Sequence, residues 1–147
     1  MNITVRIKRY DPDVDPRPRW QEFSMEVEPM DRVLDVLNEI KWEKEGSLGF
    51  RRSCAHGICG SDAMKINGRN RLACKVLVKD LGDRIDVEPL PGMPVLRDLI
   101  VDMEPFWEQY RSVMPFLVND EMPDDGKERR QSQADRQDLE QFGVMFH

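Results

Sequence analysis

The stretch SCAHGICGSDAMKINGRNRLAC, residues 53–74, decides the fold because it holds all 3 cysteines of a 147-residue chain. The spacing is C-x4-C-x2-D-x11-C, with Asp62 at the third place of the series. Plant-type [2Fe-2S] sites have the spacing C-x4-C-x2-C followed by a distant fourth cysteine. The stretch therefore predicts a loop around a [2Fe-2S] cluster, with Cys54, Cys59 and Cys74 as ligands and Asp62 at the remaining ligand position.

Small residues allow the backbone of such a loop to come close to a cluster. Gly57 and Gly60 can take positive φ and have no β-carbon to hold the chain away. Other small residues keep the loop compact: Ser53, Ala55 and Ser61. We expect Cys74 to approach from the far strand of a hairpin that follows the loop.

Asp62 has two interpretations. A carboxylate is anionic and can coordinate iron, so it would replace a thiolate without a change in formal charge while being a harder donor. Alternatively, Asp62 caps or turns the loop, and Ser61 or water takes its place at the iron. The position of Asp62 in the spacing favours ligation.

His56 raises the alternative of a different metal site. Cys54-Ala-His56 resembles half of a Rieske site, but the matching C-x2-H half is absent. Zinc held by Cys54, His56, Cys59 and Cys74 is chemically reasonable. The x4 spacing with two glycines suits a cluster loop better, so we expect His56 to face solvent or a partner.

Basic side chains flank the cysteines. They either solvate the hairpin surface or offset the negative charge of a thiolate-bound cluster, and the two roles are compatible. The residues are Arg51, Arg52, Lys65, Arg69, Arg71 and Lys75.

Composition indicates a protein with one modest core. Hydrophobic residues make up 39% of the chain, charged residues 34%, and the net charge is −6, which argues against nucleic-acid binding. Nothing approaches the roughly 18 consecutive apolar residues of a membrane span. The start, MNITVRIKRY, alternates apolar and polar residues, which predicts a strand and not a signal peptide. We therefore expect a cytoplasmic, reducing setting in which the cysteines are ligands and not disulfides.

Hydrophobic patterns outside the loop predict a small α+β domain that ends near Pro91. Residues 3–7 and 23–27 alternate as half-buried strands do, and residues 84–88 supply another strand. Asn67-Gly68 is the strongest short-range signal for a hairpin. A helix is expected within residues 31–44, with Asp31 as its N-cap and an apolar face of Val33, Leu34, Leu37 and Ile40.

The rest of the chain has a different character. Apolar residues between 96 and 110 have near-helical spacing, and Pro105 can open a second helix. Ser132 and Asp135 resemble the capping box of a last helix in a polar tail that begins at Asn119. This region has too few apolar residues for a core of its own, so we expect it to pack on something else.

Three segments together resemble one family, the iron–sulfur subunit of succinate dehydrogenase and fumarate reductase. They are RRSCAHGICGSDAMKINGRNRLAC, DLIVDMEPFWEQY and GKERRQSQADR, at residues 51–74, 98–110 and 126–136. The resemblance implies a β-grasp, plant-type ferredoxin-like domain over residues 1–103, with the cluster at Cys54, Cys59, Asp62 and Cys74. Some bacterial members also carry aspartate at the third ligand place. Residues 104–147 would be a helical and polar connector toward a second cluster domain.

The resemblance also implies a function, that of a non-catalytic electron-transfer subunit. Electrons would pass from the FAD of a flavoprotein subunit through this cluster toward further clusters and a quinone near membrane-anchor subunits. Such a subunit would lie peripherally on the inner face of the cell membrane. Family members continue into C-x2-C-x2-C-x3-C-P runs that hold [4Fe-4S] and [3Fe-4S] clusters, whereas no cysteine follows Cys74. The sequence is thus expected to be a fragment, or to work with a second domain on another polypeptide.

Two other functions remain open. One is a structural docking module with an empty or zinc-filled loop. The other is the small [2Fe-2S] subunit of another flavin- or molybdenum-dependent oxidoreductase. The molybdenum enzymes are disfavoured because the second set of cysteines in their small subunits is missing here.

Overall fold

The computed structural model describes residues 1–115, 126–128 and 130–144. Its internal contacts divide the chain into two units, Met1–Glu108 and Gln109–His147. Among the described residues, no helix is both long enough and apolar enough to cross a membrane. The first unit contains the cysteine loop.

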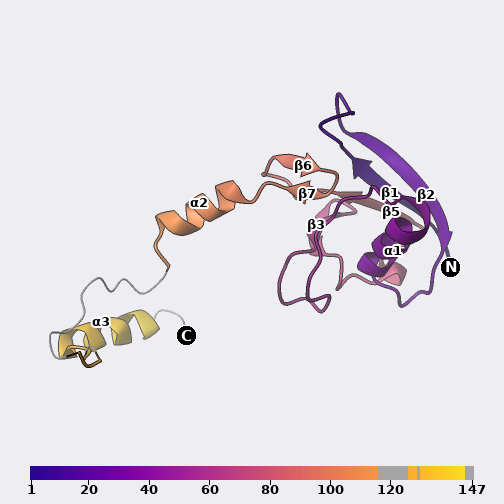
Figure 1. Ribbon diagram of the computed structural model, residues 1–147. Coiled ribbons are helices and arrows are strands. Elements are labelled where there is room, and N and C mark those ends of the chain that lie inside the picture. The colour runs from indigo at the N-terminus through magenta and orange to yellow at the C-terminus, as the bar shows by residue number, and fades with distance from the viewer. Residues whose placement is uncertain (116–125, 129, 145–147) are drawn as a thin grey trace. The chain divides into compact units, whose positions relative to one another are not determined.

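A mixed sheet of 5 strands, in the order β2-β1-β5-β3-β4, forms the body of the first unit (Figure 1). The parallel pair β1 and β5 lies at its centre, and the other neighbouring strands run antiparallel. The strands are β1 (Asn2–Arg9), β2 (Arg19–Glu26), β3 (Ala63–Ile66), β4 (Arg69–Leu72) and β5 (Arg84–Glu88). The first hairpin and the later strand predicted from alternation are confirmed.

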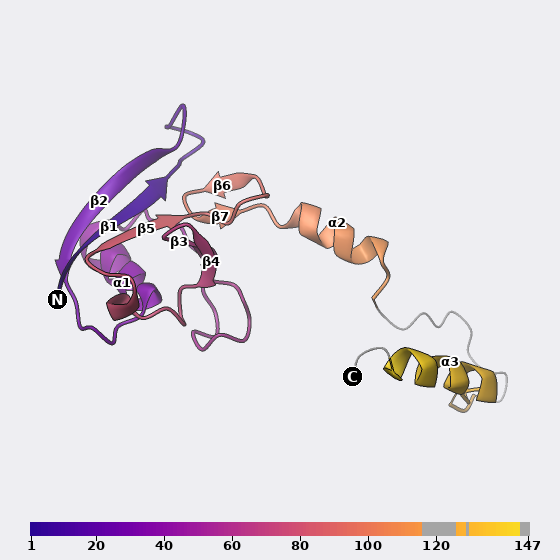
Figure 2. The same cartoon turned by 180° about the vertical axis from the view of Figure 1, so that it is seen from behind.

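Helix α1 (Val33–Glu39) packs against one face of this sheet, as seen from behind in Figure 2. A π-helical turn (Ile40–Lys44) continues it, and a short 3-10 helix (Val78–Asp80) lies later in the chain. The predicted apolar face of α1 is buried, together with the inward residues of β1 and β2. A sheet that grasps one helix in this way is the α+β, β-grasp arrangement expected.

The predicted N-cap of α1 is wrong by one residue. Arg32 is the N-cap, and its backbone N–H donates to the Asp35 carboxylate at 3.0 Å. Asp31 instead accepts a hydrogen bond from the Glu28 N–H at 2.9 Å, within the preceding turn. Asp31 precedes Arg32 and Asp35 follows it, and the local sequence does not show which of the two carboxylates bonds at the start of the helix.

The Asn67-Gly68 turn between β3 and β4 is confirmed. Both residues have positive φ, 45° and 77°, as a two-residue turn of the I′ type requires. The Asn67 side chain also accepts the Asp86 N–H at 2.7 Å, which ties the turn to β5. The hairpin therefore has a fixed register, and Cys74 lies two residues beyond the end of β4.

The helical interpretation of residues 96–101 is wrong. This stretch is a second, two-stranded hairpin of β6 (Val95–Arg97) and β7 (Ile100–Val101), and Asp98 at its turn has a φ of 48°. Asp98 is buried and paired with Arg9 from β1, a tertiary contact that overrides local spacing. The second helix, α2 (Glu104–Ser112), begins beside Pro105 as predicted.

Helix α3 (Gln133–Val144) begins at the predicted capping box. The Asp135 N–H donates to Ser132 Oγ at 3.1 Å, and the Ser132 N–H donates to the Asp135 carboxylate at 3.2 Å.

In α2 the apolar side chains are exposed, and Phe106 and Trp107 pack edge to face. The division at residues 103 and 104 stays a prediction, and part of the predicted polar tail, 119–125, lies outside the described residues.

Candidate iron–sulfur site

The cysteine loop connects the helical region to β3 and has no regular secondary structure between residues 53 and 59. Its four candidate ligands differ strongly in depth. Cys59 is exposed, Cys54 is half-buried, and Cys74 and Asp62 are only 1% and 2% exposed. All three cysteines are free thiols. The candidate site thus reaches from the surface of the loop to the edge of the core.

Glycine is required at Gly57 for two reasons. Its φ is 85°, and a β-carbon there would lie 2.6 Å from Cδ of Lys75. Gly60 has a φ of 70° with no atom in the way, so only its backbone conformation favours glycine. Positive φ was predicted for both. Ala55, with a φ of 57°, was not predicted, and no sequence signal marks it.

Cys54 and Cys59 form one pair. The Cys59 N–H donates to Cys54 Sγ at 3.4 Å. Hydrogen bonds from the backbone of Cys59, His56 and Ile58 lower the pKa of the Cys54 thiol to about 6. Backbone N–H groups therefore face this sulfur and favour its thiolate, the form that binds metal.

Asp62 and Cys74 form the second pair. The Cys74 N–H donates to Asp62 Oδ2 at 2.5 Å, and the Ala73 N–H donates to the Asp62 carbonyl at 3.1 Å. Burial raises the pKa of the Cys74 thiol, and the hydrogen bond and negative charge of Asp62 raise it further. A bound cation would oppose that shift, because it favours both anions at once.

This arrangement fits a cluster with two irons. The four candidates lie as two hydrogen-bonded pairs, and a [2Fe-2S] cluster takes four protein ligands on two irons. Three thiols and one carboxylate supply a suitable anionic donor set, although the ligand assignment itself stays a prediction.

Several side chains near the cysteines are exposed or have partners of their own. His56 is exposed, as expected. Arg51 donates to the Val101 carbonyl at 2.6 Å, the Arg52 guanidinium lies 5.5 Å from the centre of the Trp42 ring, and Lys65 pairs with Glu88 at 3.0 Å. These three basic residues have structural partners, and their role in offsetting cluster charge stays a prediction.

Residues 4–108 match the family model described as "2Fe-2S iron-sulfur cluster binding domain". The chain belongs to this family. The predicted cofactor, a [2Fe-2S] cluster, is thereby confirmed.

Relatives with curated names agree with the sequence resemblance. The succinate dehydrogenase iron-sulfur subunit of Coxiella burnetii is 48% identical over 141 residues, which cover 94% of this chain and 59% of the relative. The subunit of the same name from Paracoccus denitrificans is 44% identical over 137 residues, or 91% of this chain and 52% of the relative. This chain spans a little over half the length of these relatives.

A solved structure, "Mycobacterium smegmatis Sdh1 complex in the apo form", matches 97% of this chain and 58% of its own. The TM-score is 0.74 and the sequence identity 28%. The resemblance to succinate dehydrogenase iron–sulfur subunits predicted from three sequence segments is confirmed.

Proposed function

We propose that this chain transfers electrons in a succinate dehydrogenase or fumarate reductase. It would receive them from the FAD of a flavoprotein subunit and pass them through its [2Fe-2S] cluster toward further clusters and a quinone. The carrying observation is the pairing of Cys54 with Cys59 and of Asp62 with Cys74, in a domain similar to iron–sulfur subunits over more than 90% of this chain.

Each pair would bind one iron. Cys54 and Cys59 would hold the iron nearer the surface, and Asp62 and Cys74 the iron nearer the core, because the two pairs differ in burial. A bound [2Fe-2S] cluster accepts and releases one electron at a time. The N–H groups around Cys54 Sγ stabilise negative charge on that thiolate, which is one way in which a protein sets a cluster's reduction potential.

The surface of the loop suits contact with a partner. Ile58 is 80% exposed and adjoins the exposed Cys59. An exposed apolar side chain beside a ligand is suited to burial in an interface, and a partner that packs closely there brings its own cofactor near the cluster. We assign this surface to the flavoprotein subunit. Contact with membrane-anchor subunits, and with them a peripheral location on the inner face of the membrane, would be made through a second cluster domain, toward which residues 104–147 would be the connector.

Electron transfer from succinate tests this function. The oxidised, cluster-loaded chain would be mixed anaerobically with the flavoprotein subunit of the same organism and succinate, and the visible absorbance of the cluster followed. We expect bleaching that requires both additions, and slower bleaching in Ile58→Asp with an unchanged cluster spectrum. A cluster that dithionite reduces but the succinate-reduced flavoprotein does not would contradict the proposal. Stoichiometric zinc in place of iron would favour a docking module.

A further inference from the structure

A charged residue continues the buried alternation of β1. Ile3, Val5 and Ile7 face the core, and Arg9, two positions on, is only 4% exposed. Its Nε donates to Oδ1 of Asp98 at 2.8 Å, and Asp98 is only 2% exposed. A buried ion pair persists only when other hydrogen bonds satisfy both partners, so each remaining contact is informative.

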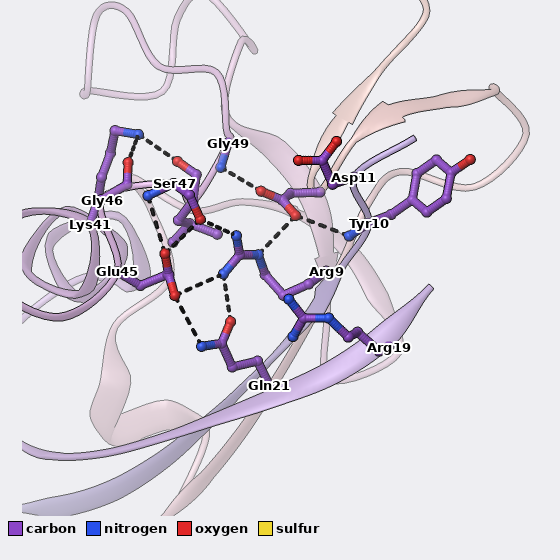
Figure 3. Close-up of polar contacts among 12 residues, drawn as sticks. Arg9, Tyr10, Asp11, Arg19, Gln21, Lys41, Glu45, Gly46, Ser47 and Gly49 are labelled. Carbon is purple, nitrogen blue, oxygen red and sulfur yellow. Dashed lines mark hydrogen bonds and ion pairs between the residues drawn. The ribbon is translucent and has the colours of Figure 1, made fainter. Parts of the chain in front are cut away.

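Both members of this pair are fully engaged. Figure 3 shows the Arg9 guanidinium pointing toward Gln21 and Ser47, to which it donates at 2.5 and 2.8 Å. The Asp98 carboxylate also accepts the Tyr10 N–H at 3.0 Å through Oδ1 and the Gly49 N–H at 2.8 Å through Oδ2. These bonds explain how Asp98 holds a positive φ, which costs a non-glycine residue energy unless its surroundings enforce it.

The hydrogen bond to Gly49 reaches the chain that leads into the cysteine loop. The Leu99 N–H donates to the Gly49 carbonyl at 3.1 Å, and two residues later Arg51 donates to the Val101 carbonyl at 2.6 Å. The approach is close, since a β-carbon on Gly49 would lie 3.4 Å from Asp98 Oδ2. The hairpin β6–β7 thus holds residues 49–51 at several points, three residues before Cys54.

We propose that Asp98, oriented by Arg9, is a positioning residue for the iron–sulfur site, although it touches no candidate ligand. It fixes the segment that delivers Cys54, while β3 and β4 fix the Asp62 and Cys74 pair. The relative placement of the two ligand pairs therefore depends on a carboxylate 24 residues beyond the last cysteine. This inference rests on the proposed ligation by Cys54.

Asp98→Asn is the sharpest test because the amide oxygen can satisfy the two donors at Oδ1, Arg9 Nε and the Tyr10 N–H, only by turning its NH2 toward the Gly49 N–H. In the cluster-loaded full chain we expect a shifted midpoint potential and an altered EPR spectrum. We also expect roughly tenfold faster loss of iron to a chelator, as loss of one hydrogen bond to a charged group implies. Amide exchange of residues 49–54 should accelerate with or without the cluster, while far-UV circular dichroism stays unchanged.

Asp86→Asn is the matched control. Asp86 also pairs with an arginine of β1, since Arg6 Nε donates to its Oδ1 at 2.7 Å, but its partners lie in the sheet and not in the loop. The same substitution there should leave the potential, spectrum, iron loss and exchange of residues 49–54 at wild-type values.

Folded Asp98→Asn with a wild-type potential, iron-loss rate and exchange would overturn the inference. If Asp98→Asn does not fold, Arg9→Lys replaces it, since lysine keeps the charge but loses the fork that orients Asp98. Faster iron loss and exchange are expected for Arg9→Lys, and wild-type values would overturn the inference equally. A wild-type chain that binds no iron would instead refute the proposed ligation, and the exchange measurement distinguishes the two failures because it needs no cluster.

Discussion

Gly57→Ala should destabilise the chain clearly more than Gly60→Ala, although both glycines lie in the cysteine loop with positive φ. The left-handed conformation costs alanine about 1 kcal/mol at either position. Only at Gly57 would the new methyl group also meet a side chain, with Lys75 Cδ at 2.6 Å and Cγ at 2.9 Å. Because Lys75 is exposed, its side chain can give way by adopting a strained rotamer, at a further cost of ~0.5–1.5 kcal/mol.

The expected losses are therefore about 1.5–2.5 kcal/mol for Gly57→Ala and about 1 kcal/mol for Gly60→Ala. Lys75→Ala removes the clashing atoms, so the double variant Gly57→Ala/Lys75→Ala should recover most of the difference. Because Lys75 is exposed, its single replacement should cost no more than about 0.5 kcal/mol.

Urea unfolding of the cluster-free chain, followed by far-UV circular dichroism, measures these free energies. The double-variant cycle separates the free energy of the contact between residues 57 and 75 from the cost of placing alanine at a positive φ. Equal losses for the two alanine variants, or no recovery on removing the lysine, would refute the close approach of the loop backbone to this side chain.

Substitutions at three further positions test other contacts of the structure. Asp62→Ala leaves the buried Cys74 N–H without its acceptor, so it should cost about 1–3 kcal/mol and make the cluster labile. Asp62→Cys should keep the cluster with an altered potential. An unchanged potential and an unchanged rate of cluster loss in both variants would place Asp62 outside the coordination shell. Asn67→Ala removes the hydrogen bond from the Asp86 N–H and places alanine at a positive φ, so the free energy of unfolding should fall by about 1–2 kcal/mol. A wild-type midpoint in urea unfolding would contradict this. Hydrogen bonding to Arg6 lowers the pKa of Asp86 below its ordinary 3.8, so this pair stabilises the fold above that pH and the stabilisation is lost as pH falls through the lower folded value. Asp86→Asn should therefore flatten the acid side of the stability profile, and an identical profile would argue against the ion pair.

Sequence patterns correctly predicted the elements that depend on residues close together in the sequence. Alternation placed Val5 and Phe23 on the buried face, where they pair directly across β1 and β2. The Asn67-Gly68 turn was predictable because only residues tolerant of positive φ fit it. Ser132 and Asp135 likewise begin a helix through contacts within four residues.

Distant contacts decided the elements that the patterns missed. Asp98 turns β6 into β7 because Arg9, 89 positions earlier, pairs with it in the core. The apolar spacing around it resembled a helix, and nothing nearby contradicted that interpretation. One signal was present, because Arg9 falls in register with the buried residues of β1, and an arginine at such a position requires a buried partner.

The site shows the same limit. Spacing predicted the candidate ligands and the need for Gly57, since both are properties of one short stretch. The pairing of Asp62 with Cys74 depends on the β3–β4 hairpin, which places residues 12 positions apart at hydrogen-bond distance. The backbone donors of His56 and Ile58 to Cys54 could not be predicted, because every residue but proline carries an N–H group.

Low-temperature EPR of the anaerobically reconstituted, dithionite-reduced chain, with iron, sulfide and zinc assayed on the same sample, tests the central claim most directly. A rhombic spin-half signal of about one spin per chain, with about two irons and two sulfides, is the predicted result. An EPR-silent sample with little iron, or one with stoichiometric zinc, would contradict the assignment of the loop as a [2Fe-2S] site.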